Sequence, residues 1–213
     1  MNPAEAFLLD QVPMALRTKV PTVLKTAYAA AKAIIADEPI LNIPSAEDNW
    51  GRFTQWAVDF GFLRLVQSGD WPFDARWRMF AKPTGRYLEI AASHSLITIS
   101  QVAEARKQPR DAVFRANKRL NNQGVFKFGE EDDERAQGLP HILLVHGHQQ
   151  LDFAHLGVPN EDQGKGYLYR TPNLLLMPHE VVAPEPAVEQ TDIEAVMTLK
   201  EEIDRWRRDT TNE

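Results

Sequence analysis

The chain has 213 residues, of which 43% are hydrophobic and 25% charged, so it can fill one large or two small soluble domains. No apolar run approaches the roughly 20 residues of a membrane-spanning helix, and Glu5 and Asp10 interrupt the N-terminal stretch that a secretory leader would keep apolar. The absence of cysteine excludes disulfides and thiolate sites. We therefore expect a cytoplasmic protein that does not bind membranes.

Positive charge is concentrated in the middle of the chain. The net charge is −6, yet residues 101–127 hold seven Lys or Arg and two acids, a local charge of +5. A basic segment on an otherwise acidic body is expected of a local contact with nucleic acid. A solvated basic helix face would give the same charge, so charge alone leaves both interpretations open.

Residues 1–80 are predicted to form a helical N-terminal region. Residues 26–36 are strong helix formers, and Pro13 and Pro21 are expected to divide the preceding arm into short helices. One face of this segment carries small side chains suited to packing on the same chain or, alternatively, to homodimerisation: Ala29, Ala33 and Ala36.

A further helix is predicted over residues 46–66, where aromatic side chains recur every three or four positions. They are Trp50, Phe53, Trp56 and Phe60. Such a stripe can stack on bases, but at helical spacing it belongs more often to the core, and we expect it there. Trp77, which follows between Arg76 and Arg78, suggests arginine–tryptophan stacking.

Residues 81–150 carry the most regular pattern of the chain. Apolar residues from Tyr87 to Ala91 are spaced as on a helix face, and a short extended link leads to Thr98 or Ser100, which can cap a second helix. Pro109 suits the first position of a third helix over residues 109–123. Residues 125–128 and 141–148 are predicted to pair as antiparallel strands.

Over about Gly85 to His148 this pattern resembles the winged helix-turn-helix of bacterial transcription regulators. The positions that match the family's pattern are Thr98, Val102, Ala103, Arg110, Val113, Arg115, Leu120, Gly124, Val125 and Phe126. The resemblance implies a recognition helix at residues 109–123 that enters the major groove of DNA.

If DNA is the ligand, Arg110 and Arg115 are expected near base edges, because guanidinium groups pair bidentately with guanine. Asn117 and Asn121 can read adenine or hold phosphate. Backbone phosphates are assigned to Arg106, Lys107, Lys118 and Arg119.

The predicted wing tip, residues 129–138, contains five consecutive acids, which DNA would repel. This supports an alternative in which the protein is a non-enzymatic adaptor or scaffold whose winged helix binds a protein partner.

Histidines suggest a weaker alternative, a metal-dependent hydrolase using the cluster from His141 to His155. His146 and His148 share one face of a predicted strand, and Asp152 follows. The acid comes four residues after His148 rather than two, and no further ligand series is present. We therefore assign no catalytic residue, metal or cofactor.

Residues 151–182 are predicted as an irregular and strand-containing extension, and residues 183–213 as a linker and C-terminal helix. Thr191 and Glu194 form a capping box for that helix. Its apolar spacing suits docking on the same chain or pairing across a homodimer: Val196, Leu199, Ile203 and Trp206.

The sequence thus predicts a mainly α-helical (α+β) protein with a winged helix-turn-helix core between a helical N-terminal arm and a C-terminal helix. The function expected from it is sequence-specific DNA binding, as a transcription regulator or a mobile-element or phage-associated protein, and not catalysis.

Overall fold

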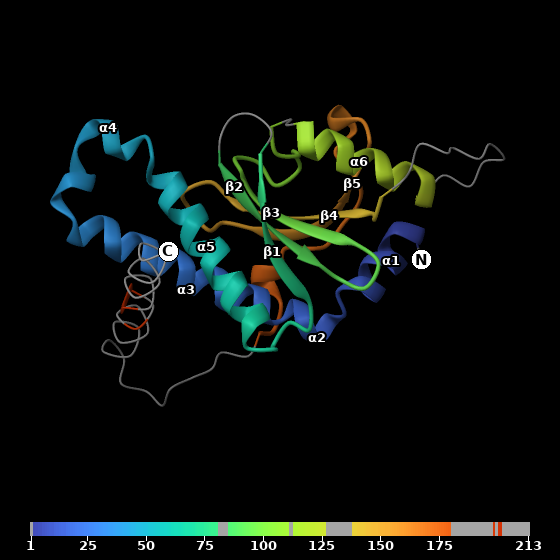
Figure 1. Ribbon diagram of the computed structural model, residues 1–213, viewed down its shortest axis with the longest axis horizontal. Coiled ribbons are helices and arrows are strands. Elements are labelled where there is room, and N and C mark those ends of the chain that lie inside the picture. The colour runs from blue at the N-terminus through green and yellow to red at the C-terminus, as the bar shows by residue number, and fades with distance from the viewer. Residues whose placement is uncertain are drawn as a thin grey trace.

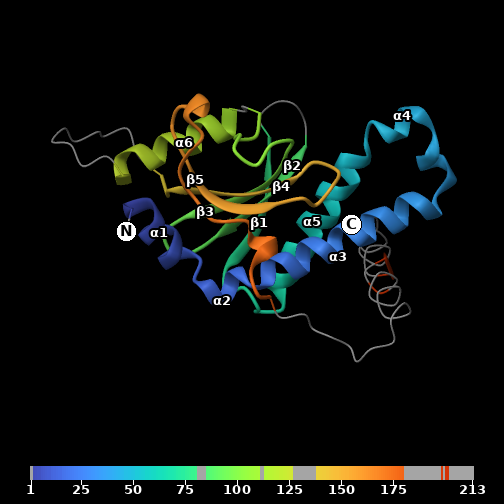
Figure 2. The same cartoon turned by 180° about the vertical axis from the view of Figure 1, so that it is seen from behind.

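The protein is a three-layer arrangement in which a mixed sheet lies between α6 and the N-terminal helices (Figure 1, Figure 2). This computed structural model describes residues 2–80, 85–110, 113–126, 138–179, 198, 200 and 201. The helices are α1 (Pro3–Gln11), α2 (Met14–Arg17), α3 (Lys19–Asp37), α4 (Pro44–Glu47), α5 (Trp50–Gln67) and α6 (Val113–Phe126), with 3-10 turns η1 (Pro39–Asn42), η2 (Gln163–Lys165) and η3 (Leu174–Leu176). The strands are β1 (Asp74–Met79), β2 (Arg86–Ala91), β3 (Leu96–Val102), β4 (His141–Gly147), β5 (Ala154–Pro159) and β6 (Tyr167–Arg170).

The strands lie in the sheet in the order in which they occur in the chain. All neighbours are antiparallel except β3 and β4, which are parallel from Leu96↔His141 to Val102↔Gly147. A parallel pair needs a crossover connection, and α6 lies within the connection that returns the chain from the end of β3 to the start of β4. The crossover places α6 on one face of the sheet.

The predicted winged helix-turn-helix was wrong. Its first helix is instead strand β2, and strand β3 takes the predicted extended link at residues 96–98 and continues to Val102, where the second helix was predicted. Residues 103–107 form bends and turns, and β2 and β3 are joined by a tight turn in which the Ala92 amide donates to the Ser95 carbonyl at 3.0 Å. Ile97 and Ile99 alternate with Thr98 and Ser100, which is a strand period. Because β3 has a partner strand on both sides, its backbone groups are satisfied by the sheet, and the protein is α/β rather than mainly α.

The remaining parts of the predicted module also pair differently. Residues 141–147 form the predicted strand, β4, but it lies parallel to β3 and not antiparallel to residues 125–128. Val125 and Phe126 belong to the end of α6. The predicted wing tip lies outside the described residues apart from Gly138.

The helical N-terminal region is present as α1 to α5. Pro13 separates α1 from α2, whereas Pro21 lies in the first turn of α3, where no intrahelical hydrogen bond needs its missing N–H. The alanine face predicted to pack on the same chain is not the buried one, and its alternative use in homodimerisation stays a prediction. Ala29 and Ala36 are exposed, and Ala27 and Ala31 are buried instead in the core that α3 shares with α5.

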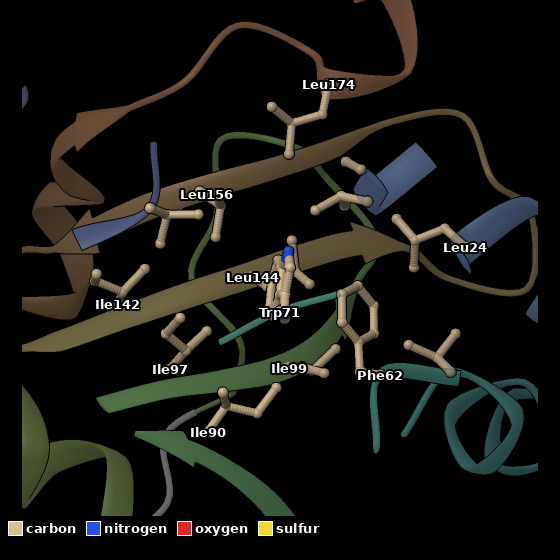
Figure 3. Packing of buried hydrophobic residues seen from close by; sticks show 14 of the residues in the cluster. Leu24, Phe62, Trp71, Ile90, Ile97, Ile99, Ile142, Leu144, Leu156 and Leu174 are labelled. Atoms are coloured by element: carbon tan, nitrogen blue, oxygen red, sulfur yellow. The ribbon is translucent and has the colours of Figure 1, made fainter. Parts of the chain in front are cut away.

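Trp71 lies at the centre of the main hydrophobic cluster (Figure 3). Its side chain is fully buried, its ring centroid lies 5.2 Å from that of Phe62, and its indole N–H donates to the Leu16 carbonyl at 2.9 Å. The cluster extends from Ala4 in α1 to Leu174 in η3. The helical region and the sheet therefore share one core.

The predicted linker and C-terminal helix lie outside the described residues except for three positions. Thr198, Lys200 and Glu201 are helical, and Lys200 Nζ forms an ion pair with Asp37 Oδ2 at 3.0 Å. None of the helices in the described part of the chain combines the length and hydrophobicity that crossing a bilayer would require.

Candidate functional site

The two faces of strands β1 to β3 carry different chemistry. Successive side chains of a strand point to opposite faces. One face contributes Ala75, Leu88, Ile90, Ile97 and Ile99 to the core beneath α5. The other, here called the polar face, consists of Arg76, Arg78, Tyr87, Glu89, Thr98 and Ser100. Strand register aligns Arg76, Glu89 and Thr98 in one row across the three strands.

Glu89 is the centre of this face. Its carboxylate is 2% exposed and receives Arg76 Nε at 2.7 Å and Arg78 Nε at 3.1 Å on Oε1, while Lys118 Nζ donates to Oε2. Burial alone would raise the pKa of Glu89, but the hydrogen bonds from Lys118 and Arg76 and the charge of Lys118 outweigh it and lower the pKa to about 2. The carboxylate is thus ionised at neutral pH.

Helix α6 brings further cationic groups to the polar face. Lys118 is only 13% exposed, and Arg115 donates through Nη2 to Ser100 Oγ at 3.2 Å and through Nη1 to the Arg110 carbonyl at 2.7 Å. Asn122 anchors the helix to the sheet, because its Nδ2 donates to the His141 carbonyl and its Oδ1 accepts from the His141 amide. These hydrogen bonds hold α6 in place on the sheet and so position Lys118 over β2.

Arg76 and Arg78 remain accessible although they are paired. Their side chains are 49% and 48% exposed, and each meets Glu89 through Nε. Within the described ranges they make no other side-chain hydrogen bond, so their terminal NH₂ groups are available to a ligand. With Lys118 they place three positive charges around one negative charge on a protein whose net charge is −6. Such a site favours an anion.

An aromatic pair lies beside these arginines. The rings of Phe80 and Tyr87 are 5.1 Å apart at 31°, and Tyr87 is opposite Arg78 in the strand register. Burial raises the pKa of Tyr87 above its ordinary value, as does Glu89, while Arg78, Arg76 and Arg115 lower it. All three arginines therefore act electrostatically on the same ring.

The residues predicted to bind DNA do not form one exposed surface. Arg106, Lys107, Arg110 and Asn117 are exposed; Arg115, Lys118 and Asn121 are partly buried; and Arg119 is 5% exposed. Lys107 pairs with Glu104, Arg119 Nη1 donates to Gln108 Oε1 at 3.3 Å, and Asn121 Nδ2 donates to the Leu139 carbonyl at 3.3 Å. Of the set, Arg115 and Lys118 reach the polar face.

Sequence reasoning missed Arg76, Arg78 and Glu89 as site residues. The signal was present in residues 74–79, DARWRM, where two arginines stand two positions apart as on one face of a strand. Trp77, between the two arginines, points to the opposite face of the sheet. The predicted stacking of Arg76 or Arg78 on Trp77 is therefore not formed.

The histidines of the predicted cluster lie on different faces of the sheet. His141 lies on the α6 side, where its Nε2 is 2.8 Å from Thr98 Oγ1, whereas His146 lies on the α3 side, where its Nδ1 is 2.7 Å from the Tyr28 hydroxyl. Burial lowers the pKa of both to about 3. In the described part of the chain, no three His, Cys, Asp or Glu side chains are grouped as metal ligands.

Compared with protein-family models, curated proteins and solved structures, the chain matches none. Fold and site together define an α/β protein with a cationic site on one face of its sheet.

Proposed function

We propose that this protein binds nucleic acid by holding backbone phosphates on the polar face. The observation that supports this most strongly is the convergence of Arg76, Arg78 and Lys118 on the buried carboxylate of Glu89. Guanidinium groups donate two parallel hydrogen bonds to phosphate, which makes arginine well suited to phosphate recognition.

Glu89 serves this function by fixing the arginines before a ligand arrives. Each Nε is held by the carboxylate, so the remaining NH₂ groups are oriented at a smaller entropic cost on binding. Helix α6 packs on β4 and β5, and on β1 the side chains of Arg76 and Arg78 remain 49% and 48% exposed. A chain of phosphates therefore has access to both arginines.

The aromatic pair favours a nucleic acid over free phosphate. Tyr87 and Phe80 lie next to Arg78, and an aromatic ring beside phosphate-binding cations can stack on a base. Arg110 and Asn117 are exposed and lie in or next to α6, and we propose that DNA bound to the polar face extends toward them. Sequence-specific contact, as in a transcription regulator, is assigned to these two residues.

Fluorescence anisotropy with a labelled oligonucleotide, single-stranded and duplex, tests the proposal over a salt series. For the double variant Arg76→Ala/Arg78→Ala we expect affinity to fall at least about tenfold. The salt slope should decrease by about 1.4–1.8, since each of the two lost phosphate contacts removes about 0.7–0.9 from it. Arg52→Ala, which removes one exposed positive charge from α5, is the matched control and should change affinity less than about twofold.

Circular dichroism confirms that each variant is folded. Absence of binding by the unsubstituted protein at low salt would contradict the proposal. So would unchanged affinity in a folded double variant, because it would reduce the two arginines to structural partners of Glu89.

A further inference from the structure

A cavity of about 720 Å³ lies at the end of the molecule opposite α1, between α3 and α5. There the two helices run beyond the sheet toward η1 and α4 (Figure 1). Small side chains, Ala31 and Ala57, face the cavity from the two helices. The volume falls within the roughly 300–1,000 Å³ of small-molecule sites.

Four aromatic side chains line the cavity: Phe53, Trp56 and Phe60 from α5, and Trp77 from β1. The sequence predicted the α5 aromatics as core, and this was wrong: Trp56 is 58% exposed, and Trp50, Phe53 and Phe60 are partly buried outside the hydrophobic clusters. Trp77 is 40% exposed, and the rings of Phe53 and Trp56 meet edge to face at 5.3 Å. Large aromatic surface is thus left in contact with solvent around a concave site.

Asp59 supplies a buried carboxylate to this cavity. It is 6% exposed, and Gln55 Nε2 donates to its Oδ1 at 2.8 Å. Among the described residues no Lys, Arg or His forms an ion pair with it, and the other charged lining groups are Glu38, Arg86 and Lys200. Lys200 is already paired with Asp37. An ionised carboxylate buried without a cation is costly, so a ligand that carries one gains affinity from Asp59.

We propose that the cavity between α3 and α5 binds a small amphiphilic amine, with its apolar body between the aromatic side chains and its ammonium group on Asp59. Tryptophan faces add cation–π attraction for the same charge. An anionic ligand would meet Asp59 and Glu38 instead. The site is separate from the polar face, since Trp77 and Arg86 point to the opposite side of β1 and β2 from Arg78 and Tyr87.

The pKa of Asp59 predicts how amine binding should depend on pH. Burial raises the pKa of Asp59 to about 7, although the hydrogen bond from Gln55 lowers it. Ammonium binding favours the ionised carboxylate, so binding releases a proton where Asp59 is protonated. We therefore expect amine affinity to increase as the pH rises from 6 to 8; the other charged groups that line the cavity are Glu38, Arg86 and Lys200.

Three naphthalene probes of similar size test the proposal by tryptophan fluorescence and calorimetry: 2-naphthylmethylamine, 2-naphthylmethanol and 2-naphthoate. We expect the amine to bind at least about tenfold more tightly than the alcohol, a difference of about 1.4 kcal/mol, because the alcohol cannot form the charge pair with Asp59. Asp59→Asn should bring the amine to the affinity of the alcohol and leave the alcohol unchanged.

Two further variants keep the test decisive. Trp56→Ala, at an exposed position, should weaken amine and alcohol alike even if Asp59→Asn does not fold. Arg76→Ala/Arg78→Ala should leave amine binding intact. Lack of binding by the amine at millimolar concentration, equal affinity for amine and alcohol, preference for the naphthoate, or an unchanged amine preference in Asp59→Asn would each overturn the proposal.

Discussion

Two acidic side chains that are buried on opposite sides of the same sheet have opposite environments. Glu89 on the polar face is surrounded by three cationic groups, and its pKa falls to about 2. Asp59 beneath the other face has an amide, Gln55, as its hydrogen-bonding side chain, and its pKa rises to about 7. Both are less than a tenth exposed.

The two faces of the sheet carry different kinds of side chain. On the α5 side the strands contribute aliphatic residues to a core that includes Trp71 and Phe62. On the α6 side the same strands carry charged groups that are held in place by one another. Around Glu89 the cations lower the pKa of the carboxylate, and we propose that they bind an anion. Asp59 is buried without a cation, and we propose that it binds one.

The largest effect is expected on the apolar side. Trp71→Ala should reduce the free energy of unfolding by about 3–5 kcal/mol, because it leaves a large cavity at the centre of the core and removes the hydrogen bond to the Leu16 carbonyl. Urea unfolding followed by circular dichroism measures the loss. Trp56→Ala, at a side chain that is 58% exposed, is the control and should change stability by less than about 1 kcal/mol. Equal losses in the two variants would contradict the assignment of Trp71 to the centre of the core.

A smaller loss is expected on the polar face. Glu89→Gln should reduce the free energy of unfolding by roughly 2–4 kcal/mol at pH 7, because three cations then converge without a negative charge. The folded-state pKa is below the ordinary value of 4.5, so the contribution of Glu89 is fully present above that pH and is lost as the pH falls toward 2.

The free energies of unfolding of Glu89→Gln and of the unsubstituted protein should therefore approach each other as the pH falls from 4.5 to about 2. Urea unfolding at a series of pH values measures both. Arg78→Ala is a useful companion, because its half-exposed side chain should contribute less than about 1 kcal/mol. If the difference in free energy of unfolding stayed constant across this pH range, the ionised carboxylate of Glu89 could not be its cause.

Parts of this fold could be predicted from local sequence. The long apolar run of β4 and the helix-forming composition of α3 identify those elements correctly, as does the spacing within α6. Strand β2 was predicted as a helix because Leu88 and Ile90 fit both a helical face and alternation around Glu89, and β3 was predicted as extended only over residues 96–98. Which period applied was decided by partner strands on either side of β2 and β3, and no local pattern contains that information.

The candidate site was less accessible to prediction for the same reason. Lys118 and Arg115 were identified because they belong to a visibly basic helix. Their context depends on Glu89, which lies 29 residues from Lys118 in the sequence, and on Arg76, which lies 13 residues from Glu89. Strand register brings these groups together. The positive charge of α6 could therefore be recognised from the sequence, but its contact with Glu89 could not.

The smallest of the expected effects has the opposite sign and tests Asp59. Asn has the same shape and cannot ionise, so Asp59→Asn removes the cost of burying a charge. Because the folded-state pKa of Asp59 lies above the ordinary value of 3.8, the unsubstituted protein should lose stability as the pH rises from about 4 through 7, and the variant should not. The shift to about 7 sets an upper limit of roughly 4 kcal/mol, and we expect a gain of roughly 1–2 kcal/mol at pH 8, since Asn must still bury a polar amide. Urea unfolding at pH 5 and pH 8 measures the change. If Asp59→Asn and the unsubstituted protein lost the same amount of stability between pH 5 and pH 8, the loss could not come from ionisation of Asp59. Of the two carboxylates, Glu89 alone would then have a pKa altered by its surroundings.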